Sequence, residues 1–219
     1  MEVKRPLLII FFVLLVDQVI KIWIKTHLFL GQEYHIAGNW FIIHFTENNG
    51  MAFGLEFGGA FGKLILSVFR IALVTGIGWY LWRLIQTKST AGSIVCFSLI
   101  FAGAIGNIID SAFYGLIFSD STEGVSSLFP AAGGYAGFLH GRVVDMLYFP
   151  LFSGTFPSWI PVWGGEPFQF FRPVFNIADS SISIGVMLLL LFQKKYFPHH
   201  HNNEVVEVRE AGAGAEMSN

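Results

Sequence analysis

Four stretches of this 219-residue chain are apolar and long enough to cross a lipid bilayer as helices, which takes about 20 residues each. They are residues 6–24, 61–85, 94–114 and 176–197. Hydrophobic residues make up 53% of the chain and charged residues only 13%, about half the charged share of a typical soluble domain. Because a soluble domain of this size could not bury so much apolar surface, we expect an integral membrane protein that is mainly α-helical.

The basic residues near the span ends predict the orientation of the chain. One set of ends is flanked by Lys4, Arg5, Arg83, Lys88, Lys194, Lys195 and Arg209, and the other set by Lys25, Lys63, Arg142 and Arg172. Cytoplasmic ends carry the excess of Lys and Arg, so we expect both termini in the cytoplasm and the loops 25–60 and 115–175 outside. No small-x-small cleavage site follows the first span, which we therefore expect to remain uncleaved.

The outer loops predict further structure above the spans. Residues 39–45 are apolar and partly β-branched, which favours a strand. Residues 155–173 contain two Trp and four Phe, a composition typical of a segment at the lipid headgroups, and we expect them to form a loop over the active site. The Ser/Gly/Ala-rich residues 119–137 predict a flexible insertion. We thus expect residues 1–197 to form one four-helix membrane domain with a small extracytoplasmic β-containing subdomain, and 198–219 to be a disordered cytoplasmic tail.

Composition also excludes several function classes. The net charge is −2 and there is no basic tract, so the chain lacks the basic surface that nucleic-acid binding requires. The single cysteine, Cys96, excludes an internal disulfide and a multi-thiolate metal site. The His-Glu-x-x-His zinc motif, the Gly-x-Ser-x-Gly elbow, the Walker loop and the dinucleotide fingerprint are absent from the sequence. We expect neither a metal ion nor a cofactor.

Ionisable residues inside the spans gather at one depth. At a rise of about 1.5 Å per residue, the following residues fall in the outer half of the bilayer or at its outer surface: Asp17, Lys21, Arg70, Asp110 and Asp179. Charges within a span are costly and are usually functional. Asp17 and Lys21 share a helix face, as a structural ion pair or with a chemical role. Asn107 and Asp110 share another face after the small residues of 103–106, which allow helices to pack closely.

Two further acids sit beside apolar residues near the expected outer surface. Asp145 lies in the segment GRVVDM and Asp179 in FNIADS. Two carboxylates that face each other share one proton, so one can take a proton from water while the other donates to a carbonyl oxygen. This is the chemistry of aspartic peptidases. The alternatives are two acids that cap helix ends and a Ser–Lys pair of Lys21 with Ser111 or Ser180, which has no supporting motif.

A transporter or channel is the main competing class, and a structural assembly subunit is a third. An ion pathway needs polar groups that continue to the inner face, but the inner halves of the four spans are nearly all apolar. A structural subunit explains the packing glycines but not two acids beside apolar stretches. This asymmetry favours an enzyme whose site faces the outer surface.

Five segments, in order along the chain, resemble the motifs of lipoprotein signal peptidase, the signal peptidase II family. The segments are residues 17–21 (DQVIK), 47–54 (ENNGMAFG), 103–110 (GAIGNIID), 143–145 (VVD) and 175–180 (FNIADS). Each segment is weak evidence by itself, but their order and the expected spans together make the resemblance strong. It covers roughly residues 5–197.

The resemblance implies an aspartic endopeptidase of the bacterial inner membrane, with its active site near the periplasmic surface. Members of the family remove signal peptides from diacylglyceryl-modified prolipoproteins, cutting before the lipidated cysteine, and are blocked by globomycin-type cyclic peptides. It assigns Asp145 and Asp179 as the catalytic pair. The implied supporting residues are Asn48, Gly50, Asn107, Asp110, Arg142, Asn176, Ala178, Asp17 and Lys21. The implied partners are lipid-modified prolipoproteins and membrane lipid.

The chain departs from the family pattern in two places. The family usually has Arg directly after the acid of its third span, where this chain has Ser111. Arg142 and Arg70 are the candidates to replace that cation. The loop 115–141 is longer than the resemblance implies, and the aromatic segment 155–173 also looks extended. These departures concern substrate contacts, because the segments that carry both aspartates are intact.

Overall fold

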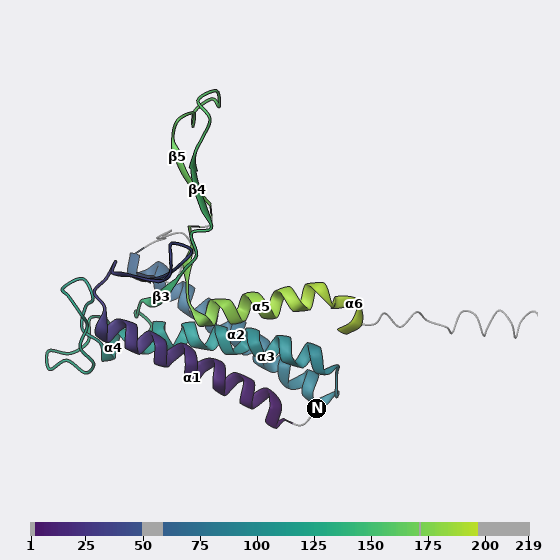
Figure 1. Ribbon diagram of the computed structural model, residues 1–219. Helices are drawn as coiled ribbons and strands as arrows, with labels where there is room; N and C mark the ends of the chain where they lie inside the picture. Colours follow the sequence, from purple (N-terminus) through teal and green to yellow (C-terminus); the bar gives the residue numbers. More distant parts are fainter. Residues whose placement is uncertain (1–2, 50–58, 171, 197–219) are drawn as a thin grey trace, which may run out of the picture.

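The computed structural model describes residues 3–49, 59–170 and 172–196. Its main helices are α1 (Lys4–His27), α2 (Gly59–Gln86), α3 (Ala91–Ile109) and α5 (Ile177–Leu191), which lie side by side as a bundle (Figure 1). Three of the described helices are long and apolar enough to span a membrane: α1, α2, and α3 with its continuation to Ile117. The helix α5 is apolar but shorter. This agrees with the expected helical membrane protein. The tail 198–219 lies outside the described residues.

Three short helical segments extend the bundle. α3 continues through one turn of π-helix, η2 (Asp110–Tyr114), into α4 (Gly115–Ile117). A π-turn inside an α-helix is frequent at functional sites because it changes the direction of side chains. The short helix α6 (Gln193–Tyr196) follows α5 at the end of the bundle where the N-terminus lies (Figure 1).

A small antiparallel sheet covers the opposite end of the bundle (Figure 1). Its strands are β1 (Glu33–Ala37), β2 (Phe41–Asn48), β3 (Val143–Tyr148) and β6 (Val174–Phe175), in the order β1-β2-β3-β6. The strand expected over 39–45 is confirmed as β2, although it begins two residues later and ends three residues later. The pairing of β2 with β3 brings residues about one hundred positions apart in sequence into direct contact.

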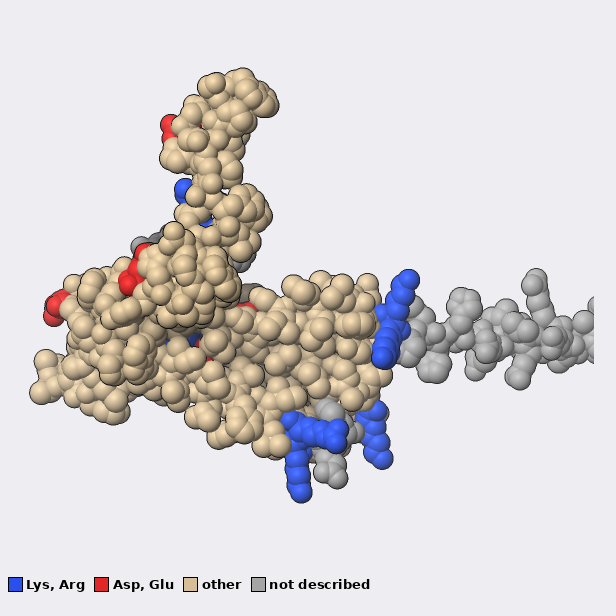
Figure 2. All heavy atoms as spheres, in the orientation of Figure 1, with Lys and Arg blue, Asp and Glu red and all other residues tan. Residues whose placement is uncertain are grey.

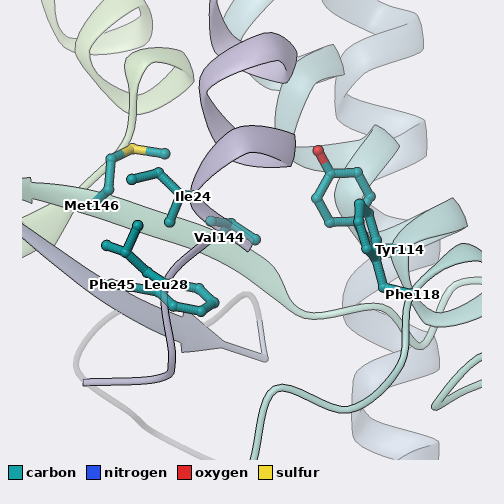
Figure 3. Close-up of a cluster of buried hydrophobic side chains, with 7 residues drawn as sticks. All are labelled: Ile24, Leu28, Phe45, Tyr114, Phe118, Val144 and Met146. Carbon is teal, nitrogen blue, oxygen red and sulfur yellow. The ribbon is translucent and has the colours of Figure 1, made fainter. Parts of the chain in front are cut away.

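A cluster of buried side chains fixes the sheet on the helices (Figure 3). Its members are Ile24, Leu28, Phe45, Tyr114, Phe118, Val144 and Met146. Burying one large apolar side chain contributes roughly 1.5–3 kcal/mol, so this contact is a substantial part of the sheet's stability. Val144 and Met146 of β3 both belong to this cluster. Because side chains alternate along a strand, Asp145 between them points to the opposite face of β3.

The flanks of the bundle are apolar and exposed, as a surface in contact with lipid must be. Phe11, Val19, Trp79 and Leu190 are all more than half exposed. Figure 2 shows almost only uncharged atoms along the helices, with Lys and Arg gathered at the end where the N-terminus lies. The described helices thus present a lipid-facing belt with a basic rim at one end.

The aromatic segment 155–173 is built around a hairpin of β4 (Phe152–Thr155) and β5 (Pro167–Phe170). The hairpin is joined to the sheet end of the bundle and projects sideways, across the direction of the helices (Figure 1). Its strands are held together by stacked rings, with Phe152 and Phe170 at 4.5 Å between centroids. The segment is therefore an ordered arm that extends sideways from the sheet.

The insertion after α4 is bound to the body of the protein, so the expectation of a plain flexible insertion is corrected. Ser121 and Ser126 are buried and their hydroxyl groups lie 2.8 Å apart. The backbone N–H of Ser126 donates to the carbonyl of Lys25 at 3.2 Å. The small residues that suggested flexibility are instead those that fit against the end of α1.

Candidate active site

The two aspartates come from different elements that meet where the sheet joins the bundle. Asp145 lies in the middle of β3 and is 5% exposed. Asp179 lies in the first turn of α5, where Asn176 is the N-cap. The Asn176 side chain accepts a hydrogen bond from the Asp179 N–H at 2.8 Å, and Asp179 Oδ2 accepts one from the Asn176 N–H at 3.3 Å. This capping box fixes the direction of the Asp179 carboxylate.

Two asparagines join the aspartates. The Asn176 amide donates to Asp145 Oδ1 at 2.8 Å, so one residue caps the helix of Asp179 and binds the Asp145 side chain. The Asn107 amide of α3 donates to Asp179 Oδ1 at 2.8 Å, and its carbonyl oxygen accepts from the Asn176 amide at 3.1 Å. The structure therefore brings together four residues singled out in the sequence, from β3, α3 and the start of α5.

The electrostatics of Asp145 suit proton transfer near neutral pH. Its carboxylate also accepts a hydrogen bond from the Asn48 amide at the end of β2. Burial, followed by the negative charge of Asp179, raises the pKa of Asp145 to about 7, although the Asn48 hydrogen bond and the charge of Lys21 act in the opposite direction. A carboxyl group with such a pKa is available in both protonation states around pH 7.

Lys21 is the centre of a buried charge cluster beneath the two aspartates. Its ammonium group lies 2.9 Å from Asp17 Oδ2 and 2.8 Å from Asp110 Oδ2, and all three side chains are fully buried. It also donates to the Asn107 carbonyl oxygen at 3.1 Å. The ion pair expected between Asp17 and Lys21 is present, and Asp110 completes it.

The two acids of this cluster hold the backbone beside each candidate catalytic aspartate. Asp17 Oδ1 accepts the N–H of Ala178 at 2.9 Å, directly before Asp179. Asp110 Oδ2 accepts the N–H of Val144 at 3.2 Å, directly before Asp145. One lysine therefore orients two carboxylates, and each of them fixes one peptide group next to the site.

Gln18 is a site residue that sequence reasoning passed over. Its amide donates to Asp17 Oδ2 at 3.1 Å and to Asp110 Oδ1 at 2.9 Å, and its carbonyl oxygen accepts from the Tyr114 hydroxyl at 3.1 Å. The sequence signal was its place inside the segment 17–21. A neutral side chain next to a charged pair is easily taken for a surface residue.

Close packing of α3 on α5 brings Asn107 within reach of Asp179. A Cβ atom at Gly103 would lie 2.2 Å from the carbonyl oxygen of Ala178, and one at Gly106 would lie 2.9 Å from Asp17 Oδ2. Only glycine fits such contacts. The expectation that small residues of 103–106 allow close helix approach is confirmed, and Ala178, also singled out in the sequence, is fully buried at this contact.

Arg142 is bound to two acids other than the aspartates of the site. Its guanidinium donates to both oxygens of Asp120, at 2.9 and 3.1 Å, and to Glu47 at 3.2 Å. These bonds hold the pKa of Asp120 well below its usual range. Arg70 of α2 instead interacts electrostatically with both Asp179 and Asp145. Of the two candidates for the missing cation, Arg70 thus interacts electrostatically with the aspartates, and Arg142 is bound to Asp120 and Glu47.

Ser111 stands where the resemblance implies an arginine. Its hydroxyl donates to the carbonyl of Asn107 in its own helix at 3.1 Å, and it is buried. The backbone carbonyl of Ser111 accepts the N–H of Gly141 at 2.8 Å, so the end of the insertion closes against it. The position therefore contributes packing and no charge.

Sequence reasoning also missed a second ion cluster, made of Lys25, Glu47, Asp120, Ser121 and Arg142, here called the Glu47 cluster. Lys25 is paired with Glu47 and lies 2.6 Å from the Ser121 hydroxyl. Glu47 directly precedes Asn48 and Arg142 directly precedes β3, so the cluster joins the ends of the strands that carry Asn48 and Asp145. The available signal was helical spacing, because Asp17, Lys21 and Lys25 fall on one face of α1.

Gly50, another residue singled out, lies outside the described residues. Within the described ranges, no group of three or more His, Cys, Asp or Glu side chains is arranged to hold a metal ion. The site as described consists of carboxylates, amides and one ammonium group.

Comparison with known proteins gives a consistent result. The family model for signal peptidase (SPase) II matches residues 9–194. A lipoprotein signal peptidase of Porphyromonas gingivalis is 57% identical over 182 residues, which cover 83% of this chain and 79% of that protein. One of Amoebophilus asiaticus is 38% identical over 177 residues, covering 80% and 71%.

Two solved structures share the fold. Both are described as bacterial membrane enzymes. One has a TM-score of 0.61 at 24% identity, covering 91% of this chain and 93% of its own. The other has a TM-score of 0.55 at 26% identity, covering 86% and 92%. The chain therefore belongs to the signal peptidase II family, the aspartic proteases of the membrane that cleave signal peptides from prolipoproteins.

Proposed function

We propose that Asp145 and Asp179 are the catalytic dyad of this peptidase and share one proton between them. The observation that carries the proposal is Asn176, which binds the Asp145 carboxylate and forms a capping box with Asp179. A single side chain thus sets the relative position of two acids that lie 34 residues apart in the sequence. The remaining polar partners, Asn48 and Asn107, hold one carboxylate each.

The shared proton allows hydrolysis without a covalent intermediate. The charged carboxylate takes a proton from a water molecule, whose oxygen attacks the carbonyl carbon of the scissile peptide bond. The protonated carboxyl donates to the carbonyl oxygen, which gives a tetrahedral intermediate. As the C–N bond breaks, the protonated member of the dyad donates to the leaving nitrogen and the other takes a proton from a hydroxyl of the intermediate, which restores the single shared proton. The products are the signal peptide with a new carboxyl end and the lipoprotein with a free amino group on its lipidated cysteine. The proton belongs to the pair.

The Ser–Lys alternative has little support in the contacts of the described residues. A lysine acts as a general base only when neutral, and Lys21 lies between two carboxylates at 2.8 and 2.9 Å. The hydroxyls of Ser111 and Ser180 donate to the carbonyls of Asn107 and Asn176. Both hydroxyls are thus turned toward their own helices.

We place the protein in the bacterial inner membrane as a single domain of residues 1–197, with both termini and the tail 198–219 in the cytoplasm. The support is the basic rim around Lys4, Arg5, Lys194 and Lys195, because cytoplasmic ends carry such an excess. The dyad lies at the opposite end of the bundle and thus near the periplasmic surface. A signal peptide in the membrane and a diacylglyceryl group in the outer leaflet both bring the scissile bond to this depth.

The same arrangement accounts for the proposed ligands. Prolipoproteins bearing the diacylglyceryl cysteine are the substrates, with their acyl chains in membrane lipid. A globomycin-type cyclic peptide presents backbone amides, which can hydrogen-bond the dyad and its asparagines as the scissile peptide does. We propose that such compounds block the enzyme by occupying the dyad, and that Gly50 and Ala178 support this binding as the family resemblance implies.

The test is cleavage of a diacylglyceryl-modified prolipoprotein by the purified full chain in detergent. Asp145→Asn and Asp179→Asn keep side-chain size but remove a carboxylate, and each should abolish detectable cleavage while the thermal unfolding midpoint stays close to that of wild type. Glu123→Gln is the matched control, because Glu123 is an exposed carboxylate in the insertion, and it should cut normally. Near-normal cutting by either folded Asp variant would refute the dyad.

A further inference from the structure

The hairpin of β4 and β5 carries large apolar side chains that nothing in the described structure covers. At its tip, Trp159 is 79% exposed, Val162 is 89% exposed and Trp163 is 60% exposed. Single exposed apolar residues are normal on any protein, but a contiguous group at the end of an arm marks an interaction site. The tip is held by backbone hydrogen bonds, since the Phe156 N–H donates to the Glu166 carbonyl at 2.9 Å and the Gly164 N–H donates to the Ile160 carbonyl at 2.9 Å.

The direction of the hairpin identifies what the tip meets. The hairpin is joined to the sheet end of the bundle and runs across the direction of the helices (Figure 1). Because the helices cross a bilayer, an arm with this direction extends along the membrane surface. The arm therefore carries the exposed tip along the membrane surface rather than into the aqueous space above it.

The charges on the hairpin agree with that placement. Glu166 is the only ionisable residue between positions 150 and 170. In Figure 2 the acidic atoms of the hairpin appear on the edge that faces away from the basic rim, and the opposite edge shows only uncharged atoms. An arm lying on lipid has this two-sided character, since charge is expelled from the side that contacts acyl chains.

We propose that this hairpin is a lipid-binding arm that inserts Trp159, Val162 and Trp163 into the outer leaflet beside the active site. Trp prefers the headgroup region because its ring is apolar and its N–H is polar. The inference takes the depth of the dyad in the membrane from the proposed function. It adds a contact between the hairpin and the lipid surface.

The arm is joined directly to both halves of the site. β4 follows β3, which carries Asp145, and β5 is followed by β6, which leads into Asn176 and Asp179. Anchoring the tip in lipid therefore fixes the height of the dyad relative to the membrane surface. A substrate whose cysteine is held at that surface by its own acyl chains then meets the dyad at matching depth.

The direct test uses spin labels in the full chain, reconstituted in phosphatidylethanolamine–phosphatidylglycerol vesicles. Cys96 is the only cysteine, so Cys96→Ala gives a background without other thiols. Val162→Cys places the label at the tip, and Glu166→Cys is the control in the same hairpin. The label at 162 should collide mainly with oxygen, which dissolves in lipid, and the label at 166 mainly with a water-soluble nickel chelate.

Two outcomes of this measurement would refute the proposal that the hairpin binds lipid. Equal exposure of both labels to the nickel chelate would place the tip in water. Shielding of the label at 162 from both reagents would indicate a protein partner or a second copy of the chain instead of lipid. Neither outcome depends on catalysis, so a failure here is distinct from a failure of the dyad.

A kinetic test addresses the consequence for substrate. Trp159→Ala combined with Trp163→Ala should raise the KM for a lipidated prolipoprotein in vesicles several-fold, with kcat nearly unchanged. The effect should be smaller in detergent micelles, which have no flat surface for the arm to lie on. Glu166→Gln is the control and should behave as wild type. An unchanged KM in vesicles for the folded double variant would contradict the proposal.

Discussion

The ammonium group of Lys21 lies 2.8 Å from the carboxylate of Asp110, and both side chains are fully buried. Asp110 in turn accepts the N–H of the residue before Asp145, while Asp17, the second partner of Lys21, accepts the N–H of the residue before Asp179. The charge cluster therefore acts on both aspartates through the backbone. A buried ion pair contributes little net stability by itself, and positioning of the dyad explains why this one is present.

Lys21→Met tests this positioning. The change keeps the apolar stem and removes the ammonium group, so Asp17 and Asp110 are left buried without a counter-charge. Breaking a buried pair in this way costs about 3–5 kcal/mol, and we expect a large fall in the thermal unfolding midpoint in detergent together with loss of cleavage. Lys195→Met, at an exposed lysine after α5, should change neither. A stable, active Lys21→Met enzyme would contradict the assigned role.

Asn176→Ala separates catalysis from folding. Loss of the helix cap should lower the free energy of unfolding by about 1 kcal/mol. Because the same residue holds Asp145, kcat should fall by about 100-fold, the usual effect of removing one preorganised donor, with KM nearly unchanged. Steady-state kinetics beside thermal unfolding give both numbers. Asn39→Ala, at an exposed asparagine, is the control, and comparable kcat values for the two variants would refute the prediction.

Asn48→Ala is expected to shift the pH dependence. The Asn48 amide donates to Asp145 and favours its charged form, which lowers the pKa of Asp145. Without that donor the pKa rises above its value of about 7, and the singly protonated dyad persists to higher pH. The descending alkaline limb of kcat/KM should therefore move upward by about one pH unit. A shift toward lower pH would show that the sign of this interaction is wrong.

Arg70 and Arg142 should respond differently to the same substitution. Arg70 interacts with both aspartates, so Arg70→Gln should reduce kcat/KM by about tenfold or more, equivalent to about 1.4 kcal/mol. Arg142 binds Asp120 and Glu47 at a partly exposed position, so Arg142→Gln should cost about 1 kcal/mol of stability and leave the pH profile unchanged. If Arg142→Gln reduced kcat/KM more than Arg70→Gln did, Arg142 would instead be the replacement cation.

The parts of the fold set by local patterns were predictable from sequence. Apolar length gave the helices, and the i,i+4 spacing of Asp17 and Lys21 indicated a shared face, because both follow from the helix repeat. The five motif segments identified the family. The small residues near Gly103 indicated close packing, which the contact with Ala178 explains.

The remaining features depend on contacts between distant parts of the chain. Asn48 reaches Asp145 only because β2 pairs with β3 in one register, and a shift by one residue would turn Asp145 to the other face. The partners of Arg142 were not predictable, because only the fold brings Asp120, inside the insertion, close enough to bind it. The burial of Ser121 could not be predicted from the sequence either, because serine-rich segments are usually exposed loops.

The central claim is that two aspartates share one proton, and the pH dependence of kcat/KM tests it most directly. We would measure cleavage of a diacylglyceryl-modified prolipoprotein from pH 4 to pH 10 with wild type and Glu123→Gln. The account predicts a bell-shaped profile for both, falling on the alkaline side near pH 7, where the dyad loses its shared proton. A rate that keeps rising through pH 9 would contradict it, because that profile requires a neutral lysine as the base.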